Sequence, residues 1–162
     1  MVNKEPSMIK VVFVPTAAID ADAIEVLPKC MHDLLDFDIP AKNIKVYDLH
    51  YKMEYNELKE YDAIYFCGGS TSYLLKRINE TGFNKPLKEF IGNGGVYVGV
   101  SAGSIISANN LPENLEYLNS KLNVHGTEGI KVGKFDPKEY SHIKLPDFKA
   151  ILINDNNFEV IE

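Results

Sequence analysis

The stretch Gly95-Val96-Tyr97-Val98-Gly99-Val100-Ser101-Ala102-Gly103-Ser104 decides the fold. Its first part is rich in β-branched and aromatic residues, which predicts a buried strand, and the residues after Ser101 can continue as a helix. A Gly-x-Ser-x-Gly motif on a sharp turn between a strand and a helix is typical of a nucleophile elbow. Such a turn exposes the serine hydroxyl, and the next N–H begins a helix, where it can bind an oxyanion. We therefore expect a serine nucleophile at Ser101.

Apolar runs alternate with helical patterns along the first hundred residues. Besides the run before Ser101, strands are predicted at Val11–Val14, Ile44–Tyr47 and Ala63–Cys67. Helices are predicted after Asp20 or Asp22, after Ser70 or Thr71, and from about Lys85 to Ile91, with a kink or restart at Pro28. This alternation predicts an α/β fold with a doubly wound, mostly parallel sheet and helices on both faces.

The pattern changes after Asn109, where short apolar runs are separated by turn residues. Strands are predicted at 122–124, 130–132, 142–145, 150–153 and 158–161, with a hairpin turn at 154–157. No repeat, low-complexity run or linker interrupts the chain. We therefore expect a single domain over residues 1–162 that ends in a short β-rich segment.

Two glycines and the serine follow neighbouring predicted strands. Gly68-Gly69 comes after the strand at Ala63–Cys67, and Ser101 comes after the next strand along the chain. Because active sites in parallel sheets lie at the carboxyl ends of the strands, we expect these residues to lie at the same edge.

Composition narrows the classes of function. A formal net charge of −6 argues against nucleic-acid binding, and two cysteines without a ligand cluster predict no disulfide framework, metal or organic cofactor. Met1 to Ser7 is polar, and the apolar run at 9–14 is too short for a secretory signal. No apolar run has the length of a membrane span, so we expect a cytoplasmic protein with no membrane partner.

A serine nucleophile needs a base that takes its proton. The first choice is His125, which ends a short apolar run and is flanked by glycine, and the alternative is His142, on the solvent face of a predicted strand. Glu128 is the first choice for the acid that orients the ring because it is near in sequence, and Glu116 and Asp155 stay open.

Several of these features also have a purely structural interpretation. Ser101 is also compatible with tight packing of a helix on a strand, and Cys67 is expected to be a buried, inert side chain. The turn at 92–95 precedes a strand, so it is not expected to bind phosphate. The tyrosines at positions 47, 51, 55 and 61 predict a half-exposed surface or a subunit contact, which leaves a homodimer open.

Three segments resemble one known family. The segment at 61–75, Tyr-Asp-Ala-Ile-Tyr-Phe-Cys-Gly-Gly-Ser-Thr-Ser-Tyr-Leu-Leu, is similar to the Gly-Gly-Asn-Thr segment of the peptidase E (aspartyl dipeptidase) family, to which cyanophycinase is related. Val12-Phe13-Val14-Pro15-Thr16-Ala17 resembles the end of that family's first strand, and the segment at 97–104 resembles its nucleophile turn. The resemblance spans about Ile9 to Ala108.

The resemblance implies a class I glutamine-amidotransferase-like fold, with serine in place of that fold's cysteine. It implies that Ser101 is the nucleophile and that the N–H of Ala102, with that of Gly69 or Gly68, forms the oxyanion hole. It further implies that Gly68, Ser70 and Thr71 line the substrate pocket, with Ser70 where the family usually has asparagine.

Two functions are consistent with these sequence features. The first is a serine hydrolase of small peptides, a dipeptidase-like enzyme that acts through an acyl-enzyme and whose substrates include aspartyl dipeptides. The alternative is a shortened, catalytically silent family member that acts as a binding or regulatory module. It is motivated by the short region after the nucleophile and by the lack of an arginine there, since Arg77 is the only arginine of the chain.

Overall fold

The computed structural model describes residues 4–162, and the chain divides into two compact units, Met1–Gly103 and Ser104–Glu162. Each unit is described by itself. The expectation of a single domain over residues 1–162, of which the first three lie outside the described part, stays a prediction.

The N-terminal unit is built on a four-stranded parallel sheet. Its strands are β1 (Val11–Val14), β2 (Ile44–Val46), β3 (Ala63–Phe66) and β4 (Val96–Gly99), in the order β2-β1-β3-β4. Every residue of β1 and β3 is buried, as expected for the central strands of a parallel sheet. The two strands that precede Gly68-Gly69 and Ser101 are neighbours, which confirms the prediction from the motifs.

Helices connect the strands of this sheet. They are α1 (Ala21–Asp36), α2 (Tyr55–Leu58), α3 (Thr71–Glu80) and α4 (Asn84–Gly92), with a 3-10 turn at Ala41–Asn43. A 3-10 turn at Pro6–Met8 precedes β1, and α5 (Ala102–Ile106) follows β4. The predicted caps are confirmed, because Asp20 accepts a hydrogen bond from Ala23 N and Ser70 accepts one from Tyr73 N. Of the kink or restart predicted at Pro28, the restart is wrong and the kink stays a prediction. The helix continues through Pro28, because Leu27 and Met31 on either side both pack on the core.

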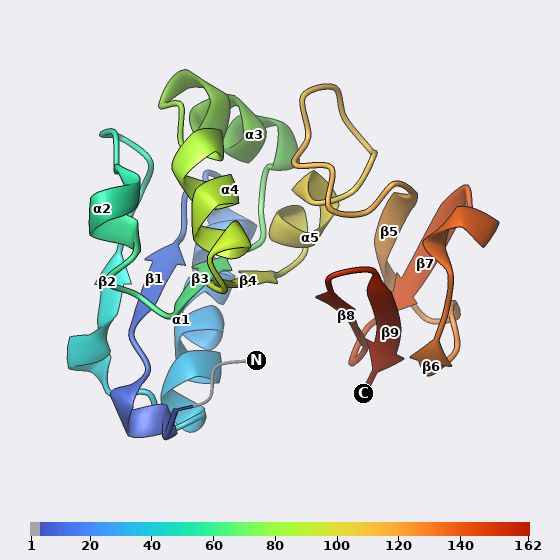
Figure 1. Cartoon of the computed structure of the whole chain (residues 1–162), viewed down its shortest axis with the longest axis horizontal. Helices are drawn as coiled ribbons and strands as arrows, with labels where there is room; N and C mark the ends of the chain where they lie inside the picture. The colour runs from blue at the N-terminus through green and yellow to red at the C-terminus, as the bar shows by residue number, and fades with distance from the viewer. Residues whose placement is uncertain (1–3) are drawn as a thin grey trace. The chain divides into compact units, whose positions relative to one another are not determined.

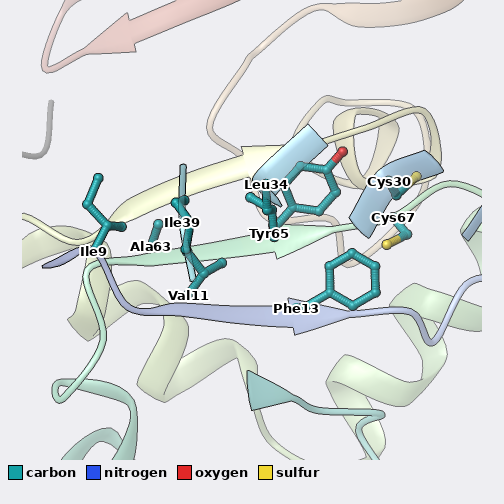
Figure 2. Packing of buried hydrophobic residues seen from close by; sticks show 9 residues of the cluster. All are labelled: Ile9, Val11, Phe13, Cys30, Leu34, Ile39, Ala63, Tyr65 and Cys67. Atoms are coloured by element: carbon teal, nitrogen blue, oxygen red, sulfur yellow. The ribbon is translucent and has the colours of Figure 1, made fainter. Parts of the chain in front are cut away.

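The sheet is covered on both faces (Figure 1), as the doubly wound pattern predicts. Figure 2 shows Cys30 and Leu34 of α1 above the face formed by alternate strand residues, with α3 and α4 on the other side. That face carries Val11, Phe13, Ala63, Tyr65 and Cys67. The sheet is thus held between two apolar layers, which fixes where its strands end.

One tyrosine of the predicted half-exposed surface differs from the expectation. Tyr47 is 1% exposed, packs edge-on against Phe83 and donates its hydroxyl to the carbonyl of Tyr51. Tyr51 is 46% exposed, so only part of the tyrosine cluster reaches solvent. Tyr47 was wrongly placed on the surface because its polar tip has a main-chain partner inside the fold.

The side chain of Arg77 in α3 forms hydrogen bonds with other residues of this unit. Its Nη2 donates to the carbonyl oxygen of Leu49 at 2.7 Å, and its Nη1 contacts Glu80 Oε2 at 2.7 Å. Leu49 is fully buried and has φ 58, in the left-handed region. The guanidinium therefore satisfies the carbonyl of a buried residue whose backbone is strained.

The C-terminal unit contains two small sheets. β5 (Lys121–Gly126) and β7 (His142–Pro146) pair in parallel, while β6 (Gly133–Lys134), β9 (Asn157–Ile161) and β8 (Ala150–Asn154) form an antiparallel sheet in that order. A 3-10 turn lies at Pro137–Glu139. The core of the unit consists of Ala108, Leu118, Leu122, Ile143 and Leu145.

Two sequence predictions for this unit have opposite outcomes. The hairpin is confirmed, since Asp155 and Asn156 connect β8 to β9. The strand predicted at 130–132 is wrong, because the strand begins at Gly133. Ile130 instead donates its N–H to the Lys144 carbonyl, and the preceding Gly129 lies so close to the same carbonyl that a Cβ would overlap it. Ile130 thus packs on the apolar core from a loop.

Candidate active site

Ser101 lies on the sharp turn that joins β4 to α5. Its φ is 50, in the left-handed region that residues other than glycine seldom adopt. Hydrogen bonds hold the turn on both sides: Val100 N donates to Phe66 O and Gly103 N donates to Val100 O, both at 2.9 Å. A strained backbone held by its surroundings is what a nucleophile elbow requires.

Glycines allow the turn to approach its neighbours closely. A Cβ on Gly68 would lie 3.1 Å from Ser101 Cβ, so the serine side chain rests against the backbone after β3. A Cβ on Gly103 would lie 2.7 Å from Phe66 O, so the start of α5 packs directly on β3. Gly68 and Gly103, one from each motif, are therefore required by close packing, and both bring the Ser101 turn close to the end of β3.

Gly69 holds a third loop against this edge of the sheet. Its φ is 127, and a Cβ there would overlap the carbonyl oxygen of Ala17, in the loop after β1. Ser70 N donates to the same carbonyl at 2.7 Å. The loops that follow β1, β3 and β4 therefore meet at the carboxyl edge of the sheet, where the parallel topology places a ligand.

Backbone N–H groups near Ser101 are the candidates for an oxyanion hole. Ala102 is the first residue of α5, so its N–H has no acceptor within that helix. At the end of β3, the N–H of Gly69 or Gly68 stays the predicted second donor beside Ala102.

The two polar residues after the glycines lie at the start of α3. Ser70 is the N-cap residue, and its Oγ lies 3.4 Å from Tyr73 N and 3.5 Å from Ser72 Oγ. Thr71 is the first residue of the helix and is half-buried. The Ser70 hydroxyl oxygen thus accepts a hydrogen bond in the cap, which limits what it can accept from a substrate.

A buried thiol pair lies directly beneath these loops. Cys30 and Cys67 are free and buried, as expected for Cys67, and Figure 2 shows them side by side. A hydrogen bond with Cys67 lowers the pKa of Cys30 to about 7, while that bond and burial raise the pKa of Cys67. Nearby, the Tyr65 hydroxyl donates to Asp33 Oδ2 at 2.9 Å.

His125 pairs with the carboxylate of Asp147, which is not among the predicted site residues. Its Nδ1 lies 3.1 Å from Asp147 Oδ1, and the two side chains are 63% and 59% exposed. The pairing of β5 with β7 explains this contact, since Gly126 is in register with Pro146 and Asp147 N donates to Gly126 O at 3.2 Å. A carboxylate on Nδ1 fixes the tautomer in which Nε2 can accept a proton.

The other candidates for the base and the acid have different surroundings. His142 is exposed, as its alternation with apolar residues predicts, and its Nε2 lies 3.1 Å from Asn123 Oδ1. Glu128 was chosen because it is near His125 in sequence, but the carboxylate found on Nδ1 of that ring is Asp147, 22 residues away. The only sequence signal for Asp147 is its place directly after an apolar strand.

Within residues 4–162, no group of three or more histidine, cysteine or acidic side chains is arranged to hold a metal ion. The helices of that same part are all too short or too polar to cross a membrane.

Comparison with known structures identifies a similar fold. A protein from Listeria monocytogenes EGD-e that is provisionally named a peptidase E protein has a crystal structure similar to this chain, with a TM-score of 0.71 and 22% sequence identity. The match covers 94% of this chain and 85% of that one. It supports the α/β fold, with a mostly parallel sheet and strands at the C-terminus.

Similar sequences carry peptidase names. The uncharacterized peptidase Lmo0363 of Listeria monocytogenes is 32% identical over 95 residues, which are 59% of this chain and 46% of the relative. The uncharacterized peptidase PM1590 of Pasteurella multocida is 35% identical over 65 residues, or 40% of this chain and 31% of that protein. The matched regions thus span less than half of either relative.

The family model described as Peptidase family S51 matches residues 1–132, which include the turns at Gly68-Gly69 and Ser101 as well as His125. With the geometry of the Ser101 turn, this match shows that the chain belongs to peptidase family S51.

Proposed function

We propose that this chain is a serine hydrolase of small peptides that acts through an acyl-enzyme on Ser101. The observation that carries the proposal is the strained backbone of Ser101, φ 50, on a turn packed against Gly68. Strain of this kind costs on the order of 1–3 kcal/mol, and a residue that served only packing would gain nothing from it. Membership of peptidase family S51 supports the same chemistry.

In the proposed reaction, Ser101 Oγ attacks the carbonyl carbon of the scissile amide and its proton passes to His125 Nε2. The carbonyl oxygen becomes an oxyanion, which the N–H groups of Gly69 and Ala102 stabilise. The C–N bond then breaks, the leaving amine takes the proton from His125, and an ester remains on Ser101. Water, deprotonated by the same imidazole, hydrolyses that ester and restores the enzyme.

His125 is the proposed base because a carboxylate already holds its ring. Asp147 Oδ1 on Nδ1 stabilises the imidazolium that forms when Nε2 takes the serine proton. We therefore propose Asp147, rather than Glu128, as the acid of the triad. His142 is the weaker candidate for the base, because its Nε2 contacts an amide oxygen.

The proposed substrates are dipeptides and other small amides, aspartyl dipeptides among them. Arg77 is held by Leu49 and Glu80, so an anionic substrate group would have to bind to lysine side chains or to backbone N–H groups. The proposed cytoplasmic location is supported by Cys30 and Cys67, two adjacent thiols that are both free.

The test compares the wild type with Ser101→Ala on a panel of dipeptides, with and without aspartyl residues. A fluorophosphonate probe reports on the same serine. Ser107→Ala is the matched control, because Ser107 is a nearby hydroxyl that donates to Ser104 O. We expect hydrolysis and labelling in the wild type and in Ser107→Ala, and neither in Ser101→Ala.

Equal hydrolysis by wild type and Ser101→Ala, with no labelling that depends on Ser101, would overturn the proposal. The silent binding module would then be the better account of the chain.

A further inference from the structure

The strand β8 leaves an open edge in the C-terminal sheet. In the part of the chain that the structure describes, β9 is the only strand that pairs with it. Four of its five residues are exposed, among them Leu152 and Ile153, at 37% and 36%. An exposed apolar edge with unpaired N–H and C=O groups is a ready template for pairing with another strand.

The hydrogen bonds of β9 show which groups of β8 face this edge. Phe135 N donates to Phe158 O at 3.1 Å, so the Phe158 carbonyl faces β6 and not β8. Its cross-strand partner Ile153 therefore belongs to a non-hydrogen-bonded pair, and the N–H and C=O of Ile153 face the open edge. Ile151, two residues away, has the same orientation.

The residues of β8 are self-complementary when two copies run antiparallel around Leu152. In that register Ile151 of one copy is opposite Ile153 of the second copy, and their edge-facing groups form the hydrogen bonds. Lys149 and Asp155 flank β8, and in this register the half-buried Lys149 of one copy is opposite the exposed Asp155 of the second. Each isoleucine is thus opposite an isoleucine, and at each end of the strand a lysine is opposite an aspartate.

Neighbouring registers with the same hydrogen-bond pattern lack this match. A shift by two residues in one direction places Lys149 opposite Ile153, and a shift in the other direction places Asp155 opposite Ile151. Each shift loses both ion pairs and puts a charge against an apolar side chain. The side chains therefore select the register around Leu152.

We propose that two copies of this chain associate through antiparallel pairing of β8 around Leu152, which joins their two C-terminal antiparallel sheets into one. The contact is isologous, with the same residues on both sides of a twofold axis. Main-chain hydrogen bonds supply affinity, and the charges of Lys149 and Asp155 supply the register. The proposal does not depend on the peptidase activity.

The first test is sedimentation equilibrium of the full chain, from about 1 μM to about 300 μM. We expect a monomer–dimer equilibrium that Ile153→Lys and Lys149→Glu each weaken by about tenfold or more. Lys134→Glu is the control, since Lys134 lies in β6 at the opposite edge of the same sheet. Thermal unfolding of each variant shows that it is folded, because Lys149 Nζ also donates to Ile130 O at 3.3 Å.

A charge reversal tests the register itself. Lys149→Glu combined with Asp155→Lys recreates the ion pair with its polarity reversed, and we expect it to recover most of the affinity lost in Lys149→Glu.

A single cysteine provides a second, covalent test. Leu152 is opposite Leu152 of the second copy, so Leu152→Cys places two thiols across a non-hydrogen-bonded pair. Oxidised glutathione then yields one disulfide between the copies and two molecules of glutathione. Ile161→Cys, on β9, is the exposed control, and wild type reports any contribution of Cys30 and Cys67.

A wild type that stays monomeric over the whole range overturns the proposal. So does a dimer that Ile153→Lys and Lys149→Glu leave unchanged, or one that Leu152→Cys does not cross-link more than Ile161→Cys.

Discussion

The two units of this chain differ in how firmly they hold the residues of the proposed site. In the N-terminal unit, β1 and β3 are buried along their whole length, and the loops after them meet around glycines that leave no room for a side chain. In the C-terminal unit, β8 is mostly exposed, and the His125–Asp147 pair lies open to solvent. The nucleophile is thus positioned by backbone packing, whereas the proposed base is positioned by a hydrogen bond between two exposed side chains.

The largest expected effect tests whether that exposed pair matters for catalysis. Asp147→Asn should lower kcat by about 10²–10⁴-fold, because an amide no longer fixes the ring tautomer or stabilises the imidazolium. Glu128→Gln is the matched control and should lower kcat by less than about threefold. Steady-state rates on the best dipeptide, followed across pH, provide the measurement. If the two variants lose the same activity, the exposed pair is not part of the machinery.

The next effect tests the tight packing of the N-terminal unit. Gly69→Ala should lower the free energy of unfolding by more than about 3 kcal/mol, since the new Cβ overlaps Ala17 O at a φ that alanine resists. Gly82→Ala has a smaller φ penalty, because φ 66 lies in the left-handed α region, and it has open space around the Cβ, so it should cost only about 1 kcal/mol. Urea denaturation compares them, and equal costs would mean that the Ala17 contact is easily relieved.

A pair of isoleucines compares the two sheets directly. Ile64→Ala in β3 removes a fully buried side chain and should cost about 2–5 kcal/mol of stability. Ile161→Ala in β9 removes one that is 39% exposed and should cost less than about 1.5 kcal/mol. The midpoints of chemical unfolding give both values. Equal losses would contradict the difference in packing between the units.

The smallest expected effect appears only at alkaline pH. Burial raises the pKa of Tyr47 from 10.0 to about 12, so the folded state keeps the phenol proton that the unfolded state releases. The stability contributed by this group is present below pH 10 and is lost as the pH rises towards 12, at no more than about 1.4 kcal/mol per pH unit.

Tyr47→Phe should therefore reduce the slope with which the free energy of unfolding falls between pH 10 and pH 12. Loss of the hydrogen bond to Tyr51 O lowers the stability of this variant by the same amount at every pH and does not change the slope. Tyr140→Phe, which removes a hydroxyl from a partly exposed ring of the C-terminal unit, should leave the slope unchanged. A slope that is the same in all three proteins would show that Tyr47 releases its proton without unfolding.

The same difference in packing explains what could be predicted from the sequence. The parallel sheet, the helix caps at Asp20 and Ser70 and the turn at Ser101 could be predicted from local patterns. Continuous apolar runs indicate buried strands, and glycines indicate tight turns. Asp147 could not be identified in this way. Its contact with His125 depends on the register of β5 on β7, which involves residues about 20 positions apart, and an exposed carboxylate has no distinguishing pattern.

The bond from Arg77 to Leu49 has a consequence for chemical modification. Because the chain has a single arginine, a dicarbonyl reagent selective for guanidinium groups has one target, and that target supports the loop around the buried Leu49. Modification should be slow in the folded protein and should proceed at the rate at which the loop around Leu49 opens. Inactivation by such a reagent, commonly taken as a sign of a substrate carboxylate site, would here report local unfolding of that loop.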